Sequence, residues 1–343
     1  MGGLPKHLLI RLYSMSRERL FDIDRAKGLA IFFVVLGHIA IHSQPDVPDW
    51  YLFLRWAIYK FHMPFFMFLS GMIFSYTYKP VKNASEYIYF IRSKVFRLMP
   101  AFFLFGILTL TGKMLTGNIM YVENIPSNYI EGLLEILISP GTSAAGSLWF
   151  IYVLFEFYLI FPLLLVIFRG NIWVIFVLSV PAYFLPNVPY LLMGAAANFA
   201  LFFAAGIVAM NYYQHYQRFI CSYRWLFLVI FLGSYSTELI FDYGIPKVLI
   251  GLCSIPAFHA LVATSPLSNS RSLYVLGMYS FPIYLMNMII IGLLKGLFLK
   301  FSGWSGNLFF IYLITLLLFG LCGPILIKKY IFSRIPVLDR ITT

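Results

Sequence analysis

Long apolar stretches, separated by short polar or charged segments, fill the chain from about residue 26 to residue 327. Each stretch runs for roughly 17–25 residues, the length that an α-helix needs to cross the hydrocarbon core of a bilayer. The pattern therefore predicts an all-α, polytopic membrane helix bundle with about ten transmembrane helices. They are expected at 26–43, 56–77, 98–116, 147–168, 171–187, 190–210, 225–241, 246–264, 273–298 and 307–327.

The composition supports a membrane protein built as one domain over residues 1–343. Of its 343 residues 61% are hydrophobic and 11% charged, and the mean hydropathy is +0.85. A soluble domain typically carries about 25% charged residues. The net charge of +12 would suit nucleic acid, but in a chain this apolar it indicates positive charge gathered on the cytoplasmic side, so no nucleic-acid partner is expected. The three cysteines show no metal-ligand spacing and are interpreted as core-filling thiols.

Lysine and arginine positions predict the orientation. Nineteen of the 25 lie on the amino-terminal side of the predicted spans, and segment 117–146 contains none. By the positive-inside rule, both termini are expected to be cytoplasmic. Residues 1–25 and 328–343 then form cytoplasmic tails, 78–97 a basic cytoplasmic loop and 117–146 an outer loop. The remaining six cations are expected near the opposite face: Arg55, Lys60, Lys113, Lys247, Lys295 and Lys300.

The outer loop holds one further element. Residues 129–138 carry apolar side chains at helical spacing, which predicts a short helix lying on the membrane surface.

Histidines inside the first two spans are the leading candidates for chemistry. His38 lies 11 residues beyond Lys27, which places it about 16 Å into the membrane. His42 follows one turn later, and His62 should approach both if the first two helices are antiparallel. An ionisable side chain inside a span is a functional-site hypothesis, and histidine can take a proton from a hydroxyl and return it to a leaving group. Alternatively, each is a hydrogen-bonded packing residue.

A metal site is a second explanation of these histidines, because an i, i+4 pair can bind zinc. No carboxylate or cysteine lies nearby in sequence, so no metal is expected. The other three histidines, His7, His215 and His259, are expected to be structural or exposed to solvent.

Two more features suggest binding or catalysis. The basic group of Lys27, Arg92, Lys94 and Arg97 predicts an anion site at the cytoplasmic edge, unless it serves only as positive-inside anchoring. Glu156 lies in the middle of an apolar helix, where a carboxylate must be paired or protonated. It would orient a histidine, pair with an arginine or contact substrate.

Several motifs, spread in order along nearly the whole chain, resemble the membrane-bound acyltransferase-3 family. The resemblance covers the first, second, third and fourth helices of that family and one late helix. The matching segments are DRAKGLAIFFVVLGH at 24–38, FHMPFFMFLSG at 61–71, the basic run 92–97 followed by Pro100, SLWF at 147–150, and YSFPIYL at 279–285.

The resemblance implies transfer of an acyl group, usually acetyl, from cytoplasmic acyl-CoA to a hydroxyl of a cell-surface or lipid-linked sugar or polysaccharide. It implies acetyl-CoA as co-substrate and a bacterial-type cytoplasmic (inner) membrane. Besides the lipid bilayer, glycan-biosynthesis proteins are conceivable partners.

The same resemblance gives the basic cluster the CoA phosphates as its ligand and gives His38 the role of catalytic base or acyl-handling histidine. The hypothesis built on it has His62 and Glu156 orient or stabilise the site and Trp149 shape the acceptor cavity. His38, His62 and Glu156 form the catalytic group, and Lys27, Arg92 and Arg97 bind the CoA phosphates. Trp149 and Asp24 are the expected substrate contacts.

Two departures from the family pattern and two rival functions remain. Many members have arginine at the position of Lys27, and many have a histidine where this chain has Met286-Asn287.

The first rival is a polysaccharide or small-molecule transporter, because intramembrane histidines also serve proton coupling. No paired half-repeats or matching broken helices favour it. The second is a non-catalytic scaffold, which leaves the intramembrane ionisable residues without a shared purpose.

Overall fold

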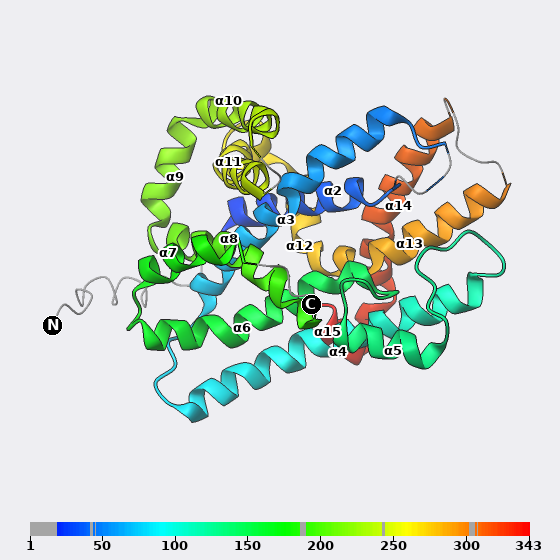
Figure 1. The fold of residues 1–343 in the computed structure, drawn as a ribbon, viewed down its shortest axis with the longest axis horizontal. Coiled ribbons are helices and arrows are strands. Elements are labelled where there is room, and N and C mark those ends of the chain that lie inside the picture. The colour runs from blue at the N-terminus through cyan, green and yellow to red at the C-terminus, as the bar shows by residue number, and fades with distance from the viewer. Residues whose placement is uncertain are drawn as a thin grey trace.

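The computed structural model describes residues 19–41, 44, 46–185, 190–241, 244–301, 306 and 308–343, and within these ranges it contains helices and no strand (Figure 1). His7 and His42 lie outside the described residues. The α-helices are α2 (Phe21–Gly37), α3 (Asp49–Thr77), α4 (Ala84–Thr116), α5 (Tyr129–Ile138), α6 (Trp149–Ile167), α7 (Ile172–Ala182), α8 (Met193–Asn211), α9 (Tyr213–Ser222), α10 (Arg224–Ser234), α11 (Gly244–Ala263), α12 (Arg271–Met278), α13 (Ser280–Phe301), α14 (Leu308–Tyr330) and α15 (Pro336–Ile341).

Many of these helices are long and apolar enough to cross a membrane. Among the described residues seven pass that test, namely α3, α4, α6 with the turn before it, α8, α11, α13 and α14 with the turn after it. The pair α9 and α10, bent by 78°, would make an eighth. The predicted all-α polytopic bundle is confirmed, whereas the number of ten spans and the side on which the termini lie stay predictions.

Several predicted boundaries differ from the structure: α3 begins at Asp49 instead of 56, α7 ends at Ala182 instead of 187, and α10 ends at Ser234 instead of 241. The first helix spans Phe21–Gly37 instead of 26–43. Asp22 and Asp24 occupy its first turn, where carboxylates stabilise the positive end of the helix dipole. The predicted span at 273–298 is two helices, α12 and α13, with a break at Tyr279.

The segment 78–97, predicted as a loop, is helical from Ala84 onward and is the start of the 33-residue α4. The Asn83 side chain accepts a hydrogen bond from the Glu86 backbone N–H, and the Glu86 carboxylate accepts one from the Lys82 N–H. This reciprocal cap satisfies backbone donors that a helix start otherwise leaves unpaired. The density of charge in this segment suggested a loop, but the capping residues stabilise the start of a helix there. The predicted short helix at 129–138 is confirmed as α5.

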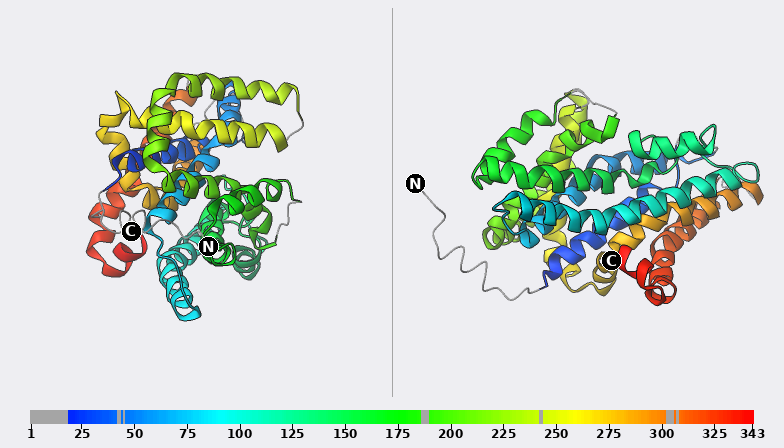
Figure 2. Two further views of the ribbon diagram at one scale, coloured as in Figure 1. Left: turned by 90° about the vertical axis from the view of Figure 1, so that its left-hand side faces the viewer. Right: turned by 90° about the horizontal axis from the view of Figure 1, so that it is seen from below.

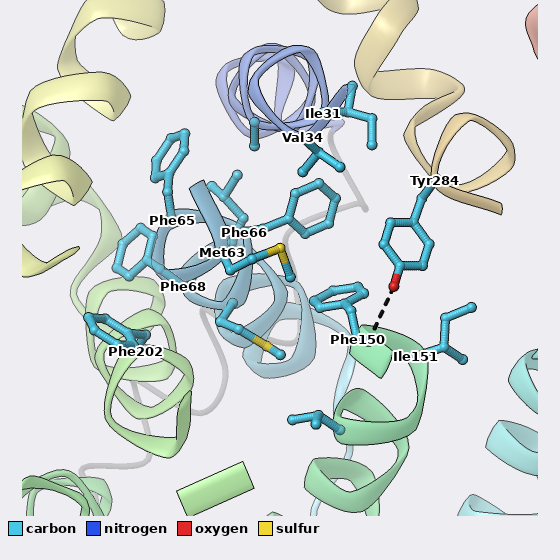
Figure 3. Packing of buried hydrophobic residues seen from close by; sticks show 14 of the residues in the cluster. Ile31, Val34, Met63, Phe65, Phe66, Phe68, Phe150, Ile151, Phe202 and Tyr284 are labelled. Carbon is cyan, nitrogen blue, oxygen red and sulfur yellow. Dashed lines mark hydrogen bonds between the residues drawn. The ribbon is translucent and has the colours of Figure 1, made fainter. Parts of the chain in front are cut away.

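Helix α3 is the centre of the packing and contacts α2, α8 and α11. Figure 3 shows its side chains Phe65, Phe66 and Phe68 directed toward different neighbours in the buried apolar cluster. The long helices α4, α6 and α13 run in roughly the same direction past this centre (Figure 2). The bundle thus holds α2 and α3 side by side in its interior.

Helix α2 is also held very close to α12. A Cβ placed on Gly28 would lie 1.9 Å from the Leu273 carbonyl oxygen, and one on Gly277 would lie 1.7 Å from the Asp24 carbonyl oxygen. Glycine permits this approach because it has no side chain, as is common where membrane helices meet. The contact fixes the first turns of α2, which carry Asp24 and Lys27.

Candidate active site at the two ends of helix α2

The structure places His38 next to His62. His38 caps the carboxyl end of α2 and donates its backbone N–H to the Val35 carbonyl. Its ring centroid is 6.4 Å from that of His62 on α3, with the two rings nearly perpendicular. Two of the three histidines singled out in the sequence are therefore neighbours, as expected if consecutive helices pack together.

The ring nitrogens of this pair are not all used. His62 Nδ1 donates a hydrogen bond to the Ile58 carbonyl at 2.8 Å, so in the neutral ring Nε2 carries a lone pair that can accept a proton. His38 Nδ1 is buried and has no hydrogen-bond partner among the described residues. A buried polar atom without a partner indicates a group that a substrate could complete.

An aromatic ring and a cation complete this end of α2. The Tyr59 ring centroid lies 6.0 Å from that of His38 and 4.9 Å from that of His62. The Arg55 guanidinium sits 4.1 Å above the Tyr59 ring, one helical turn away on α3. Sequence reasoning placed Arg55 near the opposite face of the membrane but did not connect it with His38.

The other end of α2 carries the predicted donor residue Lys27 in an ion-pair cluster. The Asp24 carboxylate is buried and lies 2.7 Å from both Arg19 Nε and Lys27 Nζ. The hydrogen bond with Asp24 raises the pKa of the Arg19 guanidinium. A cavity of about 390 Å³ opens here, lined by Arg19, Leu20, Ile23, Asp24, Lys27, Ile73 and Tyr76.

Asp24, which was predicted to contact substrate, is therefore distant from the histidines. It lies 14 residues before His38 on α2, which corresponds to about 21 Å along the axis. Both of its carboxylate oxygens are occupied by cations. This arrangement fits a residue that holds Lys27 in place better than one that contacts an acceptor beside His38.

The predicted basic residues of α4 do not form one cluster with Lys27 in the described contacts. Arg92 and Arg97 are exposed, and the Arg92 guanidinium lies 5.5 Å from the ring of Phe96. Lys94 is half-buried, with its Nζ 4.6 Å from the Tyr158 ring of α6. Helix α4 packs against α6. The side chains of Arg92 and Arg97 lie exposed on the surface of the protein.

Glu156 and Trp149 lie on α6, which packs against α4 and α8. One carboxylate oxygen of Glu156 is buried without a hydrogen-bond partner in the described part of the chain, and none of the described contacts joins it to His38 or His62. Trp149 packs on Phe199 with ring centroids 5.1 Å apart.

The start of α6 is anchored to α13. The Phe150 backbone N–H donates to the Tyr284 hydroxyl at 3.2 Å (Figure 3), and that hydroxyl donates to the Ser147 carbonyl. The SLWF and YSFPIYL motifs, far apart in sequence, are thus in direct contact.

Sequence reasoning missed a buried polar network at the Lys27 end. His259 is fully buried on α11, with Nε2 3.0 Å from Asp22 Oδ2 and Nδ1 3.1 Å from the Tyr216 hydroxyl. Asp22 also accepts hydrogen bonds from Tyr213, at 2.6 Å, and from Gln217. The available signal was the position of His259 within an apolar span, but its partners come from α2 and α9.

Asp22→Asn should weaken this network, because an amide cannot accept from all three donors as a carboxylate does. We expect a loss of about 1–3 kcal/mol in stability, measured by thermal unfolding in detergent. Asp49→Asn is the matched control, since Asp49 is exposed and surface changes usually stay within about 0.5 kcal/mol. Equal losses in the two variants would contradict a structural role for the network.

No group of three or more His, Cys, Asp or Glu side chains suited to a metal ion occurs among the residues that the structure describes. The expectation that the protein uses no metal stays a prediction.

Comparison with known proteins identifies the family. The family model described as "Acyltransferase domain", of the acyltransferase-3 family, matches residues 20–329. The nodulation protein NolL of Mesorhizobium japonicum is 22% identical over 217 residues, which cover 63% of this chain and 54% of NolL. The chain thus spans about half the length of this curated relative. No solved structure matches the chain significantly. Because the family model covers nearly the whole chain, the protein belongs to the acyltransferase-3 family, and the described helices that are long and apolar enough to cross a membrane make it a multi-pass membrane protein.

Proposed function

We propose that this acyltransferase transfers an acyl group, in the first place acetyl, from cytoplasmic acyl-CoA to a hydroxyl of a cell-surface or lipid-linked sugar in a bacterial-type inner membrane. The observation that carries the proposal is the arrangement of α2, with Lys27 at a cavity near one end and the His38–His62 pair at the other. The 11 residues between Lys27 and His38 correspond to about 16 Å. A donor with phosphates at one end and a thioester on a long flexible arm suits this separation.

The His38 imidazole acts as the general base in this proposal. It takes the proton of the sugar hydroxyl while the hydroxyl oxygen attacks the thioester carbonyl carbon. The carbon–sulfur bond then breaks, and the CoA thiolate leaves with the proton returned by the imidazolium. His62 and the Arg55–Tyr59 pair lie where they can stabilise the charge that develops on the carbonyl oxygen. A brief acyl-His38 intermediate is the alternative order of bond formation.

The remaining candidate residues receive unequal support. Lys27 lines the cavity and is the best placed phosphate ligand, whereas Arg92 and Arg97 would contribute from the exposed surface of α4. Trp149 would shape the acceptor cavity at the start of α6. The contacts do not favour Glu156 as a catalytic group or Asp24 as an acceptor contact.

The test is incorporation of label from radiolabelled acetyl-CoA into a mixed glycan acceptor fraction, using membranes with and without the protein. Label in glycan only when the protein is present supports acyl transfer. Accumulation of sugar in vesicles without CoA, together with no label transfer, would instead favour the transporter. One broken span, the bent α9–α10 pair, occurs among the described helices, but an inverted-repeat transporter would need a matching one in its other half.

Lys27→Ala should weaken acetyl-CoA binding, because a phosphate would lose a charge-assisted contact worth about 1.5–3 kcal/mol, or roughly tenfold to 100-fold in Kd. The measurement is equilibrium binding of acetyl-CoA to the purified protein in detergent. Lys79→Ala, at an exposed lysine that follows α3, controls for general loss of positive charge. An unchanged donor affinity in Lys27→Ala would refute the phosphate role.

A further inference from the structure

Three cationic side chains from three different helices converge at the His38 end of the bundle: Arg55 of α3, Lys113 of α4 and Lys295 of α13. Lys295 is 7% exposed, and its Nζ lies 3.4 Å from Glu123 Oε1. Lys113 also interacts electrostatically with Glu123 and Lys295, and Arg55 does so with Lys295 and His38. Arg55, which packs on the Tyr59 ring next to His38, therefore brings this positive charge to the histidine that is proposed to react.

The positive charge in this cluster exceeds the negative charge. Glu123 is its one carboxylate in the described contacts, and it also accepts a hydrogen bond from Gln44. Arg55 and Lys113 form no ion pair within the part of the chain that the structure covers. The Arg55 Nε is in addition buried without a hydrogen-bond partner there. Arg55 and Lys113 are half-buried, and even a partly buried charge is costly to remove from water unless it is paired.

A bound anion would restore this balance, and the side chains suit one. An arginine presents a planar fork of N–H donors to a carboxylate or phosphate, and lysines add compact positive charges. The packing of Arg55 on Tyr59 at 4.1 Å holds the guanidinium beside the His38–His62 pair. A wholly neutral sugar would leave these donors without a charged partner.

The anion belongs to the acceptor and not to the donor if the donor phosphates lie at Lys27, at the other end of α2. Resting on the proposed function, we infer that Arg55, Lys113 and Lys295 form an anion subsite for an acidic acceptor, whose phosphate or carboxylate lies close to the hydroxyl that is acylated. The shared chemistry is an acidic group on or next to the sugar. A diphosphate link to a lipid and an acidic sugar residue are its two sources.

The experiment is equilibrium binding of three probes to the purified protein in detergent: a neutral glucose oligosaccharide, a glucuronate-containing oligosaccharide of the same length, and a polyprenyl-diphosphate-linked glucose. At least one acidic probe should bind about tenfold or more tightly than the neutral one. Which of the two does so distinguishes a carboxylate from a diphosphate. Binding needs no turnover, so the result can be read even if acyl transfer from CoA is disproved.

Variants test whether the cluster is responsible. Arg55→Gln and Lys295→Gln should weaken the acidic probe about tenfold to 100-fold. Lys295→Gln should in addition leave acetyl-CoA binding unchanged. Glu123→Gln should have the opposite effect and tighten acidic binding, which a merely misfolded variant would not do. Lys300→Gln is the control, because Lys300 is an exposed cation on the same helix end.

Two outcomes would overturn the inference. One is equal binding of neutral and acidic probes by the wild-type protein. The other is a loss of acetyl-CoA binding in Lys295→Gln, which would place the donor phosphates at this end of α2.

Discussion

His38→Ala is expected to lower acyl transfer by about 10²–10⁴-fold, the contribution typical of a general acid or base. The imidazole caps α2 beside His62, and its buried Nδ1 has no partner among the described residues. Alanine removes the imidazole that is proposed to accept the hydroxyl proton. The measurement is transfer of label from radiolabelled acetyl-CoA to the glycan fraction, with membranes that contain equal amounts of each variant.

A matched control separates catalysis from folding. His215 lies exposed on α9, so His215→Ala should retain wild-type transfer and show that loss of a histidine as such is harmless. Acetyl-CoA binding by His38→Ala should also persist, because the proposed phosphate ligands lie at the far end of α2. Normal transfer in His38→Ala would remove this residue from the mechanism.

Gly277→Ala is expected to produce the largest loss of stability. The added Cβ would lie 1.7 Å from the Asp24 carbonyl oxygen, a distance that forces α2 and α12 apart. Overpacking of this kind costs about 1–3 kcal/mol, and occasionally more. Thermal unfolding in detergent measures the loss. Since the contact also fixes the first turns of α2, the variant should bind acetyl-CoA more weakly.

Gly292→Ala on α13 is the control for this substitution. A Cβ at Gly292 would have no neighbouring heavy atom within 4 Å, and alanine favours a helix interior over glycine by about 1 kcal/mol. The control should therefore be as stable as the wild type or slightly more so. A Gly277→Ala protein of wild-type stability would show that α2 and α12 can separate without cost.

Local patterns in the sequence predicted much of what the structure contains. Helix length and apolarity identify membrane-crossing elements because each span must satisfy its own backbone hydrogen bonds. Helical spacing alone predicted α5, and the proximity of consecutive helices led to His62 as the neighbour of His38. The start of α4 is also encoded locally, because Asn83 and Glu86 of its cap are three residues apart. The high density of charge in this segment nevertheless favoured the prediction of a loop.

Contacts between segments that lie far apart in the sequence could not be predicted from the sequence alone. Asp22 meets His259 only because α2 packs against α11, and nothing in either segment specifies the rotation of its helix. Asp24 was expected at the substrate, yet its oxygens are taken by Arg19 and Lys27.

The sequence by itself indicated a helical membrane protein that resembles the acyltransferase-3 family, with His38 as its leading candidate for chemistry. The lengths of the apolar stretches and the spacing of the motifs are properties of the amino-acid sequence, so they can be determined without the structure. Only the tertiary structure decided that Arg55 packs on Tyr59 beside that histidine and that Lys295 of another helix pairs with Glu123. The physical reason is that side-chain packing between helices, including the glycine contact at Gly277, sets which face of each helix meets which.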